Sequence, residues 1–244
     1  MRRQVPASKA DRAESNPGLY KRPPQSWSPS YHVRNRWSSH RPMNAASSPY
    51  LFLERPSWIV LFVCCLLAFN ALSMWTRTRE RRWASGEVRD SGSRVAIYLF
   101  TLLGIGLAFA GPFFVPSARI VLPHGPVFWV AMVIFWTGAV FYGSSVLTLG
   151  QSFRTSVQLL EGQKLVTNGL YGCIRHPAYT GGILMFAGLG LATGNWFSVA
   201  AASVSMFTGY FFRIRVEERV LAERFGAEFA AHRRRTWAVI PPIW

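Results

Sequence analysis

The apolar residues of this chain gather in long blocks that carry few or no charges. A helix needs about 20 apolar residues to cross a hydrocarbon core of about 30 Å, and only helices and closed barrels satisfy their backbone there. Three blocks of this kind predict membrane helices at Ser57–Trp75, Val95–Val115 and Pro126–Leu149. The pattern predicts an all-α, polytopic membrane protein.

Two shorter apolar blocks follow, at Ala178–Thr193 and Trp196–Phe212. Only Gly194 and Asn195 separate them, and Gly-Asn is a turn dipeptide. We therefore expect a helical hairpin, which brings the bundle to about five transmembrane helices. A single bent helix over both blocks is the alternative.

Residues 1–56 are rich in Pro, Ser and Arg and show no sustained periodicity. A segment of this composition buries too little apolar surface to offset its ordering entropy, so it is predicted to be a disordered tail. Translation from Met43 is an alternative that would remove most of it. The expected organisation is this tail, three helices over 57–149, and a ligand-binding part over 150–244.

The remaining segments are polar. Residues 77–94 are expected to form a basic loop, and residues 150–177 an irregular connector. After Phe212 the chain is predicted to continue as a helix to about Arg235. Leu221, Phe225 and Phe229 recur in it at four-residue spacing, which indicates a helix lying on the membrane interface or docked on the bundle. The final IPPIW then ends this helix.

The formal net charge of +16 could indicate a nucleic-acid partner, but its distribution indicates membrane lipids instead. Ten of the 27 Lys and Arg precede Ser57, six lie between the first two predicted spans and seven follow the last. Basic residues next to span ends follow from anionic headgroups and the positive-inside rule. The rule places residues 77–94, 150–177 and the end of the chain in the cytoplasm, although the basic amino-terminal tail opposes this orientation.

Cysteine and histidine spacing indicates no metal site. Cys64 and Cys65 are adjacent in the first predicted span, and Cys173 stands alone in the connector. His176 has no second His, Asp or Glu at ligand spacing, so we expect no zinc.

The segment with the richest chemistry is residues 164–182, whose sequence is KLVTNGLYGCIRHPAYTGG. Pro177 suits the first turn of a helix, and the positive end of that helix suits an anionic ligand group. His176 alone is more often a structural residue, and Tyr171 and Tyr179 fit an interfacial aromatic belt as well as the walls of a site for an organic cation. Glycines in the segment permit turns and close packing, or the approach of a ligand.

Arg213 and Glu217 lie one helical turn apart at the end of the last predicted span. They form an ordinary helical ion pair in one interpretation. In the other, Arg213 holds an anionic substrate and Glu217 accepts hydrogen bonds from a ligand, because charges at membrane depth are costly enough to favour a role.

The joint pattern resembles the isoprenylcysteine carboxyl methyltransferase family of integral-membrane enzymes. It comprises LVTNGLYGCIRHPAYTGG, an apolar hairpin, RIRVEERVLAERFGAEF and a final IPPIW, and the similarity covers roughly residues 147–244. The resemblance implies a carboxy-terminal half that binds S-adenosyl-L-methionine, with a tunnel from the bilayer for a lipidic substrate.

The resemblance also implies site residues. The family's cofactor-binding positions fall on the following residues: Gln163, Lys164, Leu165, Val166, Tyr171, His176, Pro177, Ala178, Tyr179 and Glu217. The substrate-orienting arginine falls on Arg213. The methyl group of a sulfonium is already activated, so proximity and orientation at the site suffice for transfer to a lipidic carboxylate.

Three alternatives stay open on the sequence alone. The acceptor could be a thiol, a phospholipid amine or a small membrane metabolite. A sterol-type reductase that binds NADPH has a similar motif but about ten spans. A non-catalytic membrane protein with the same fold is the third.

Overall fold

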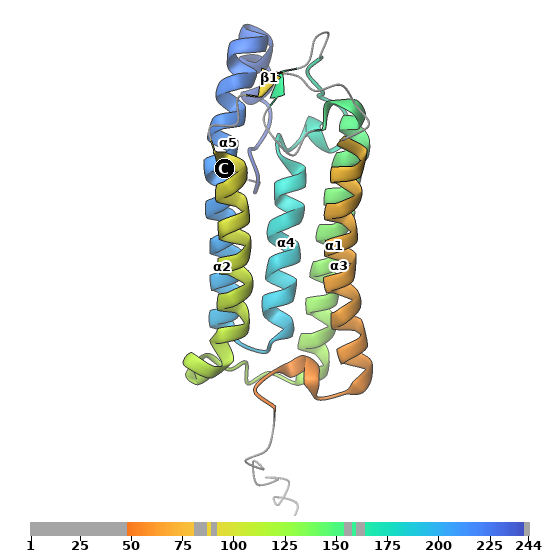
Figure 1. Cartoon of the computed structure of the whole chain (residues 1–244), viewed down its shortest axis with the longest axis vertical. Helices are drawn as coiled ribbons and strands as arrows, with labels where there is room; N and C mark the ends of the chain where they lie inside the picture. Colours follow the sequence, from red (N-terminus) through yellow and green to blue (C-terminus); the bar gives the residue numbers. More distant parts are fainter. Residues whose placement is uncertain (1–47, 81–86, 89–91, 154–157, 160–163, 242–244) are drawn as a thin grey trace, which may run out of the picture. The chain divides into compact units, whose positions relative to one another are not determined.

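The computed structural model describes residues 48–80, 87–88, 92–153, 158–159 and 164–241, all within the compact unit 46–244. Five helices make up this unit: α1 (Pro56–Glu80), α2 (Ser93–Phe114), α3 (His124–Leu149), α4 (Pro177–Ala192) and α5 (Trp196–Arg233). They run alternately up and down, with α4 between the α2–α5 pair and the α1–α3 pair (Figure 1). The predicted all-helical bundle is confirmed.

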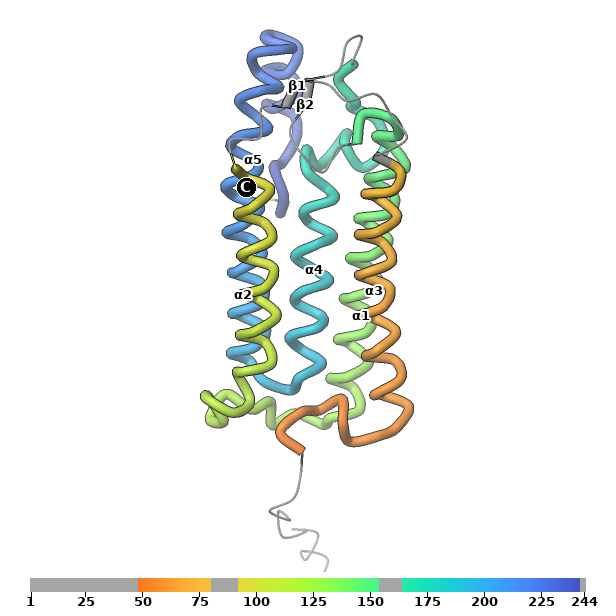
Figure 2. The backbone as a smooth tube through the Cα atoms, viewed as in Figure 1, coloured from red at the N-terminus to blue at the C-terminus, as the bar shows by residue number. Residues whose placement is uncertain are grey.

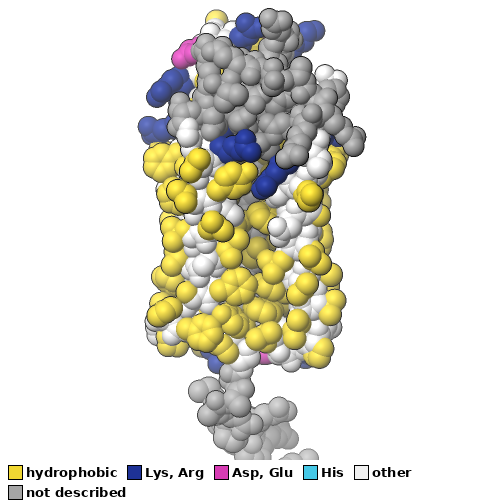
Figure 3. Space-filling view, viewed as in Figure 1, with side chains coloured by type: hydrophobic (Ala, Val, Ile, Leu, Met, Phe, Trp, Pro, Cys, Tyr) yellow, Lys and Arg dark blue, Asp and Glu magenta, His cyan; other side chains and the backbone are white. Residues whose placement is uncertain are grey.

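Four of the helices are long and apolar enough to cross a membrane, while α4, with 16 residues, is shorter. Large apolar side chains cover the described helices on the face shown in Figure 3, and Lys and Arg gather beyond the edge of this belt. The chain is therefore an integral-membrane protein.

The helical hairpin is also confirmed, because Gly194 adopts a positive φ of 77° and the Asn195 side chain accepts a hydrogen bond from Ser198 N, capping α5. Glycine takes this backbone conformation without strain, and an Asn cap supplies an acceptor for an unpaired helix N–H.

Small residues set the closest helix contacts. A Cβ at Gly138 of α3 would lie 2.5 Å from the Gly181 carbonyl oxygen of α4, and one at Gly188 would lie 2.7 Å from the Ala131 oxygen. In α2, a Cβ at Gly104 would meet Ser205 of α5 at 3.2 Å. Apolar side chains gain little by leaving lipid, so close backbone approach is what holds membrane helices together.

Several predicted boundaries were wrong. Helix α1 extends to Glu80 and α2 begins at Ser93, so Arg77 and Arg79 are helical rather than in a loop. By contrast, the predicted continuation of the helix after Phe212 to about Arg235 is confirmed, because α5 runs on to Arg233, with a bend at Gly226, whose φ is 46°. The helix beyond Phe212 is docked on the bundle, because Phe229 is buried.

The ordered chain also starts earlier than the predicted tail boundary at Ser57. Residues Leu51–Leu53 form the 3-10 helix η2, and Leu51 and Phe52 are buried at the hairpin end of the bundle. Leu51 N donates to the Thr193 carbonyl across this end. Residues 1–47 lie outside the described part of the chain.

The opposite end of the bundle carries the irregular connector. The two-residue strands β1 (Glu87–Val88) and β2 (Gln158–Leu159) pair antiparallel there (Figure 1). The 3-10 helix η5 (Gly169–Gly172) and the start of α4 lie at the same end of the bundle (Figure 2). Polar groups from distant parts of the sequence meet at this end.

Candidate functional site

A cavity of about 480 Å³ opens at the connector end and reaches down between the helices. Its wall comes from all five helices and from residues 164–176. Polar and charged side chains gather in its upper part, and they include Lys164, Tyr171, Arg175, His176, Tyr179, Arg213 and Glu217. Its deeper part is lined almost entirely by apolar side chains of α1, α2, α4 and α5. One cavity thus combines a polar and an apolar compartment.

The Tyr179 hydroxyl joins the two charged residues of α5. It donates to Glu217 Oε2 at 2.7 Å and accepts from Arg213 Nε at 3.2 Å. Arg213 is only 2% exposed, and its Nη1 donates to Ser93 Oγ of α2 at 2.9 Å. The guanidinium is therefore held by α2 and α4 in one orientation at the boundary between the two compartments.

Three stacked rings form one wall beside this contact. The Tyr179 ring lies 5.4 Å from the His176 ring and 4.6 Å from the Tyr210 ring. A Cβ at Gly182 would lie only 2.2 Å from the Tyr210 hydroxyl, so this glycine makes room for the stack. Such a wall of π faces suits an organic cation or a planar base.

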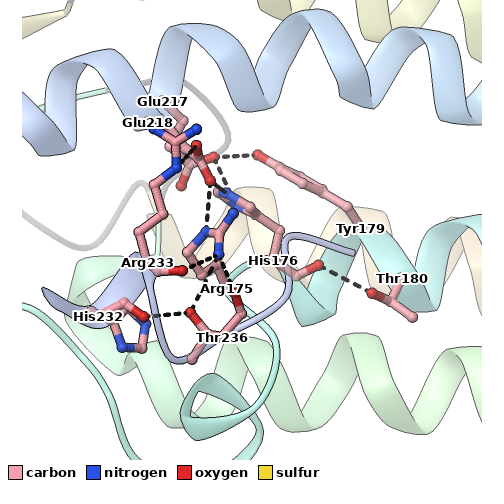
Figure 4. Close-up of polar contacts among 9 residues, drawn as sticks. All are labelled: Arg175, His176, Tyr179, Thr180, Glu217, Glu218, His232, Arg233 and Thr236. Carbon is pink, nitrogen blue, oxygen red and sulfur yellow. Dashed lines mark hydrogen bonds and ion pairs between the residues drawn. The ribbon is translucent and has the colours of Figure 1, made fainter. Parts of the chain in front are cut away.

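A second acidic residue organises the loop before α4 (Figure 4). Glu218 Oε1 accepts from Arg175 Nε at 2.7 Å and lies 3.3 Å from His176 Nε2. His176 Nδ1 lies 3.8 Å from Glu217 Oε2, so the buried imidazole sits between two carboxylates. Arg175 and Glu218 are themselves largely buried, and a charged hydrogen bond of this kind fixes both partners.

The chain after α5 returns to the same loop. Arg175 N donates to the Trp237 carbonyl at 2.8 Å and His176 N to the Ala238 carbonyl at 3.0 Å. The Arg175 side chain also donates to the Thr236 carbonyl, which ties the end of α5 to the start of α4. Through these hydrogen bonds, the carboxy-terminal strap, residues 236–239, fixes the backbone position of His176.

Tyr171 lies in η5 and is 7% exposed. Its burial, together with the nearby charge of Glu217, raises the pKa of the hydroxyl, while a hydrogen bond with Ser145 of α3 opposes the shift. The phenol is therefore neutral at physiological pH and contributes a hydroxyl and an apolar ring to the cavity.

The structure brings together nearly all of the residues that the sequence singled out. Nine of them line the cavity: Lys164, Leu165, Val166, Tyr171, His176, Ala178, Tyr179, Arg213 and Glu217. Pro177 is buried at the first position of α4 and acts through the backbone rather than by lining the cavity. Gln163 lies outside the described residues.

Sequence reasoning missed Glu218, Ser93 and Tyr210. Glu218 stands beside Glu217 in the RVEE run, and helical spacing alone does not tell which of two adjacent carboxylates faces which cation. Ser93 carries no signal in the sequence because its role depends on how α2 packs against α5. Tyr210 follows from the helical period, since it lies three residues before Arg213.

The residues present suit a ligand that carries a cation, hydroxyls and amines. Glu217 is 31% exposed by its side chain and faces the cavity, so its carboxylate is accessible to such groups. The aromatic wall and the backbone of residues 164–166 lie around the same space. Arg213 adds one cation, fixed by Ser93 and Tyr179, at the boundary with the apolar compartment.

Comparisons with known proteins find several similar sequences and a similar fold. The family model described as phospholipid methyltransferase matches residues 126–228. Protein-S-isoprenylcysteine O-methyltransferase B of Arabidopsis thaliana is 29% identical over 116 residues, which are 47% of this chain and 58% of that protein. The cobalt-zinc-cadmium resistance protein CzcN of Cupriavidus metallidurans is 34% identical over 47% of this chain and 52% of its own.

A solved structure shares the fold. The eukaryotic intramembrane Ras methyltransferase ICMT (isoprenylcysteine carboxyl methyltransferase) superposes with a TM-score of 0.50 at 23% identity, over 60% of this chain and 52% of that one. The chain thus spans about half the length of the proteins that it matches. These similarities show that the chain shares the helical fold of ICMT and is similar in sequence to isoprenylcysteine O-methyltransferases over about half of its length.

Proposed function

We propose that this protein is a membrane methyltransferase that uses S-adenosyl-L-methionine and transfers its methyl group to the carboxylate of a lipidic acceptor, in the manner of an isoprenylcysteine carboxyl O-methyltransferase. The observation that carries the proposal is the Tyr179 hydroxyl, which links Glu217 and Arg213 where the polar and apolar compartments of one cavity meet. A site of this form receives a polar ligand from one side and a lipid from the other.

Glu217, Tyr171, His176 and the segment 164–166 would hold the donor. Glu217 would accept hydrogen bonds from hydroxyl or amine groups of the donor, and the rings of His176 and Tyr179 would lie beside its positively charged sulfur. When bound, S-adenosyl-L-methionine supplies a methyl group on a positively charged sulfur. Ala178 and Pro177 at the start of α4 would complete the polar compartment, and Gln163 belongs to the same proposal through the family resemblance alone.

Arg213 would hold the acceptor. Its guanidinium is fixed by Ser93 and Tyr179, so it can pair with a carboxylate without first losing side-chain freedom. A carboxylate is already a nucleophile, and no general base is required. Catalysis then rests on placing the two reacting atoms in line and excluding water, which is a proximity effect.

The apolar compartment indicates that the acceptor carries a lipid tail. A lipid tail can pass from the bilayer into a space lined by apolar side chains at little cost in free energy, whereas a water-soluble acid would leave that space unfilled. The distribution of Lys and Arg favours a cytoplasmic location for the polar end, since residues 77–94, 150–177 and the end of the chain are basic.

The proposal is tested by calorimetric titration of the purified protein with S-adenosylhomocysteine, followed by transfer of a labelled methyl group to S-farnesylcysteine. Binding and a base-labile methyl ester are the expected results. Absence of S-adenosylhomocysteine binding would overturn the proposal, and NADPH binding would point to a reductase.

The match to a phospholipid methyltransferase model favours one second candidate, methylation of a lipid amine. The donor compartment would be the same, and Arg213 would then pair with the acceptor's phosphate. Mass spectrometry of the product distinguishes the two, because an N-methyl group survives mild base and a methyl ester does not.

A further inference from the structure

The apolar compartment of the cavity has a floor. A separate void of about 20 Å³ lies beyond it, and the two spaces share four lining residues, which are Leu66, Ile105, Phe186 and Leu189. These side chains, from α1, α2 and α4, form a partition one residue thick. Phe186 is 1% exposed, and its ring meets the Phe69 ring edge-on at 5.6 Å, so it cannot swing aside freely.

The depth of the floor can be placed against the charged end. Phe186 follows Tyr179 by seven residues on α4, which corresponds to about 10 Å along the helix axis. Met206 precedes Arg213 by the same interval on α5 and also lines the cavity. An acceptor whose head group lies at Arg213 therefore has roughly 10 Å of cavity depth for its tail.

The side chains that line this deepest part differ in burial. Leu66, Phe69 and Ile105 are half-buried, while Phe186, Leu189 and Met206 are buried. Higher up, the cavity reaches the lipid-facing surface at Tyr98 and Leu102 of α2, which are 38% and 68% exposed. A tail that enters there and follows the wall downward ends against Phe186.

We propose that Phe186 sets the length of the apolar tail that this site accepts, with Leu66, Ile105 and Leu189 completing the floor. Tails short enough to end above the phenyl ring fill the compartment. A longer tail must fold back or leave part of itself outside, and one misfitted apolar group in such a pocket changes specificity on the order of 10-fold or more. The inference rests on the proposed function for its acceptor class but not for its geometry.

Two series of probes with increasing chain length test this proposal. The first is S-geranyl-, S-farnesyl- and S-geranylgeranylcysteine as methyl acceptors, compared by kcat/KM. The second is a series of straight-chain carboxylic acids, from octanoate to stearate, whose affinity for the protein in neutral-lipid nanodiscs is measured by native mass spectrometry. In the wild type, both series should show a chain length, the break point, beyond which kcat/KM or affinity stops rising.

Substitutions at the floor should move that length in opposite directions. Phe186→Leu opens the partition toward the void and should extend the break point to longer chains, with the longest probe gaining on the order of 10-fold. Ile105→Phe raises the floor and should shift the break point to shorter chains. Phe135→Leu removes the same ring from a buried site on α3 that lines neither space, and should leave the break point unchanged.

The outcomes separate the two proposals. A break point in acid binding that Phe186→Leu moves, without any methyl transfer, upholds the floor and rejects the proposed function. Methyl transfer with no break point, or with one that Phe186→Leu and Phe135→Leu shift equally, rejects the floor and leaves the function standing.

Discussion

The two ends of the bundle are built by different means. At the hairpin end, aromatic rings and backbone hydrogen bonds close the structure: the Tyr50 ring stacks on Phe52 and its hydroxyl donates to the Phe109 carbonyl. At the connector end, buried side chains of opposite charge meet across three segments, as Arg175 and Glu218 do.

The two ends differ in how much their buried side chains contribute to the free energy of folding. Burying apolar rings and pairing backbone groups stabilises a fold directly. Burying charged groups costs desolvation that their pairing only partly offsets, so such groups add little stability for their cost. The hairpin end therefore mainly stabilises the fold. The connector end retains buried charges despite their desolvation cost, which is expected where the charges bind a ligand. Substitutions at the hairpin end should therefore change stability alone, whereas substitutions at the connector end should affect stability, ligand binding or both.

The largest effect is expected at Arg213. Arg213→Ala should lower kcat by about 10²- to 10³-fold, the range for loss of one fixed charge-stabilising group. The dissociation constant for S-adenosylhomocysteine should change little, because the guanidinium faces the acceptor side. Steady-state kinetics and calorimetry measure the two quantities, and Arg213→Lys should restore only part of the activity because it lacks the fork that reaches both Ser93 and Tyr179.

The next effect is on stability at the connector end. Removing one partner of a buried ion pair costs about 3 kcal/mol or more, so Glu218→Gln and Arg175→Gln should each lower the free energy of unfolding by about that amount. The double variant should cost clearly less than the two single costs together. Glu228→Gln on the exposed surface of α5 is the matched control and should change stability little. Additive costs would mean that the pair is not coupled.

A weaker but more selective effect is expected at Glu217. Glu217→Ala should weaken S-adenosylhomocysteine binding by about 1.5–3 kcal/mol, or roughly 10- to 100-fold, because one charged hydrogen-bond acceptor is lost. Glu217→Gln, which keeps one acceptor oxygen, should lose less. Calorimetry gives the constants, and unchanged affinity in both variants would show that the carboxylate does not contact the donor.

The smallest effect is expected at the hairpin end. Asn195→Ala removes the cap of α5 and the hydrogen bond to the Val115 carbonyl, and should lower the free energy of unfolding by about 1–2 kcal/mol without changing S-adenosylhomocysteine affinity. Asn195→Ser keeps a capping oxygen and should recover part of the loss. If ligand affinity falls with stability, the two ends are not independent.

Helix content and the membrane location could be predicted from the sequence because they depend on local composition. Long apolar blocks lie where α1, α2 and α3 form, and Gly194-Asn195 marks the hairpin turn. Helix ends were less predictable, because polar residues can continue a helix beyond its apolar block: α1 runs on to Glu80, past its predicted end at Trp75.

The same distinction between local sequence and tertiary packing applies to the residues of the site. The sequence by itself determined a set of polar residues near one membrane face, among them His176, Tyr179, Arg213 and Glu217. Only the tertiary structure decided that Tyr179 stands between Arg213 and Glu217, that Glu218 takes Arg175, and that Phe186 closes the cavity. Helical spacing specifies which side chains share a face, but which partner that face meets depends on how α2, α4 and α5 pack together.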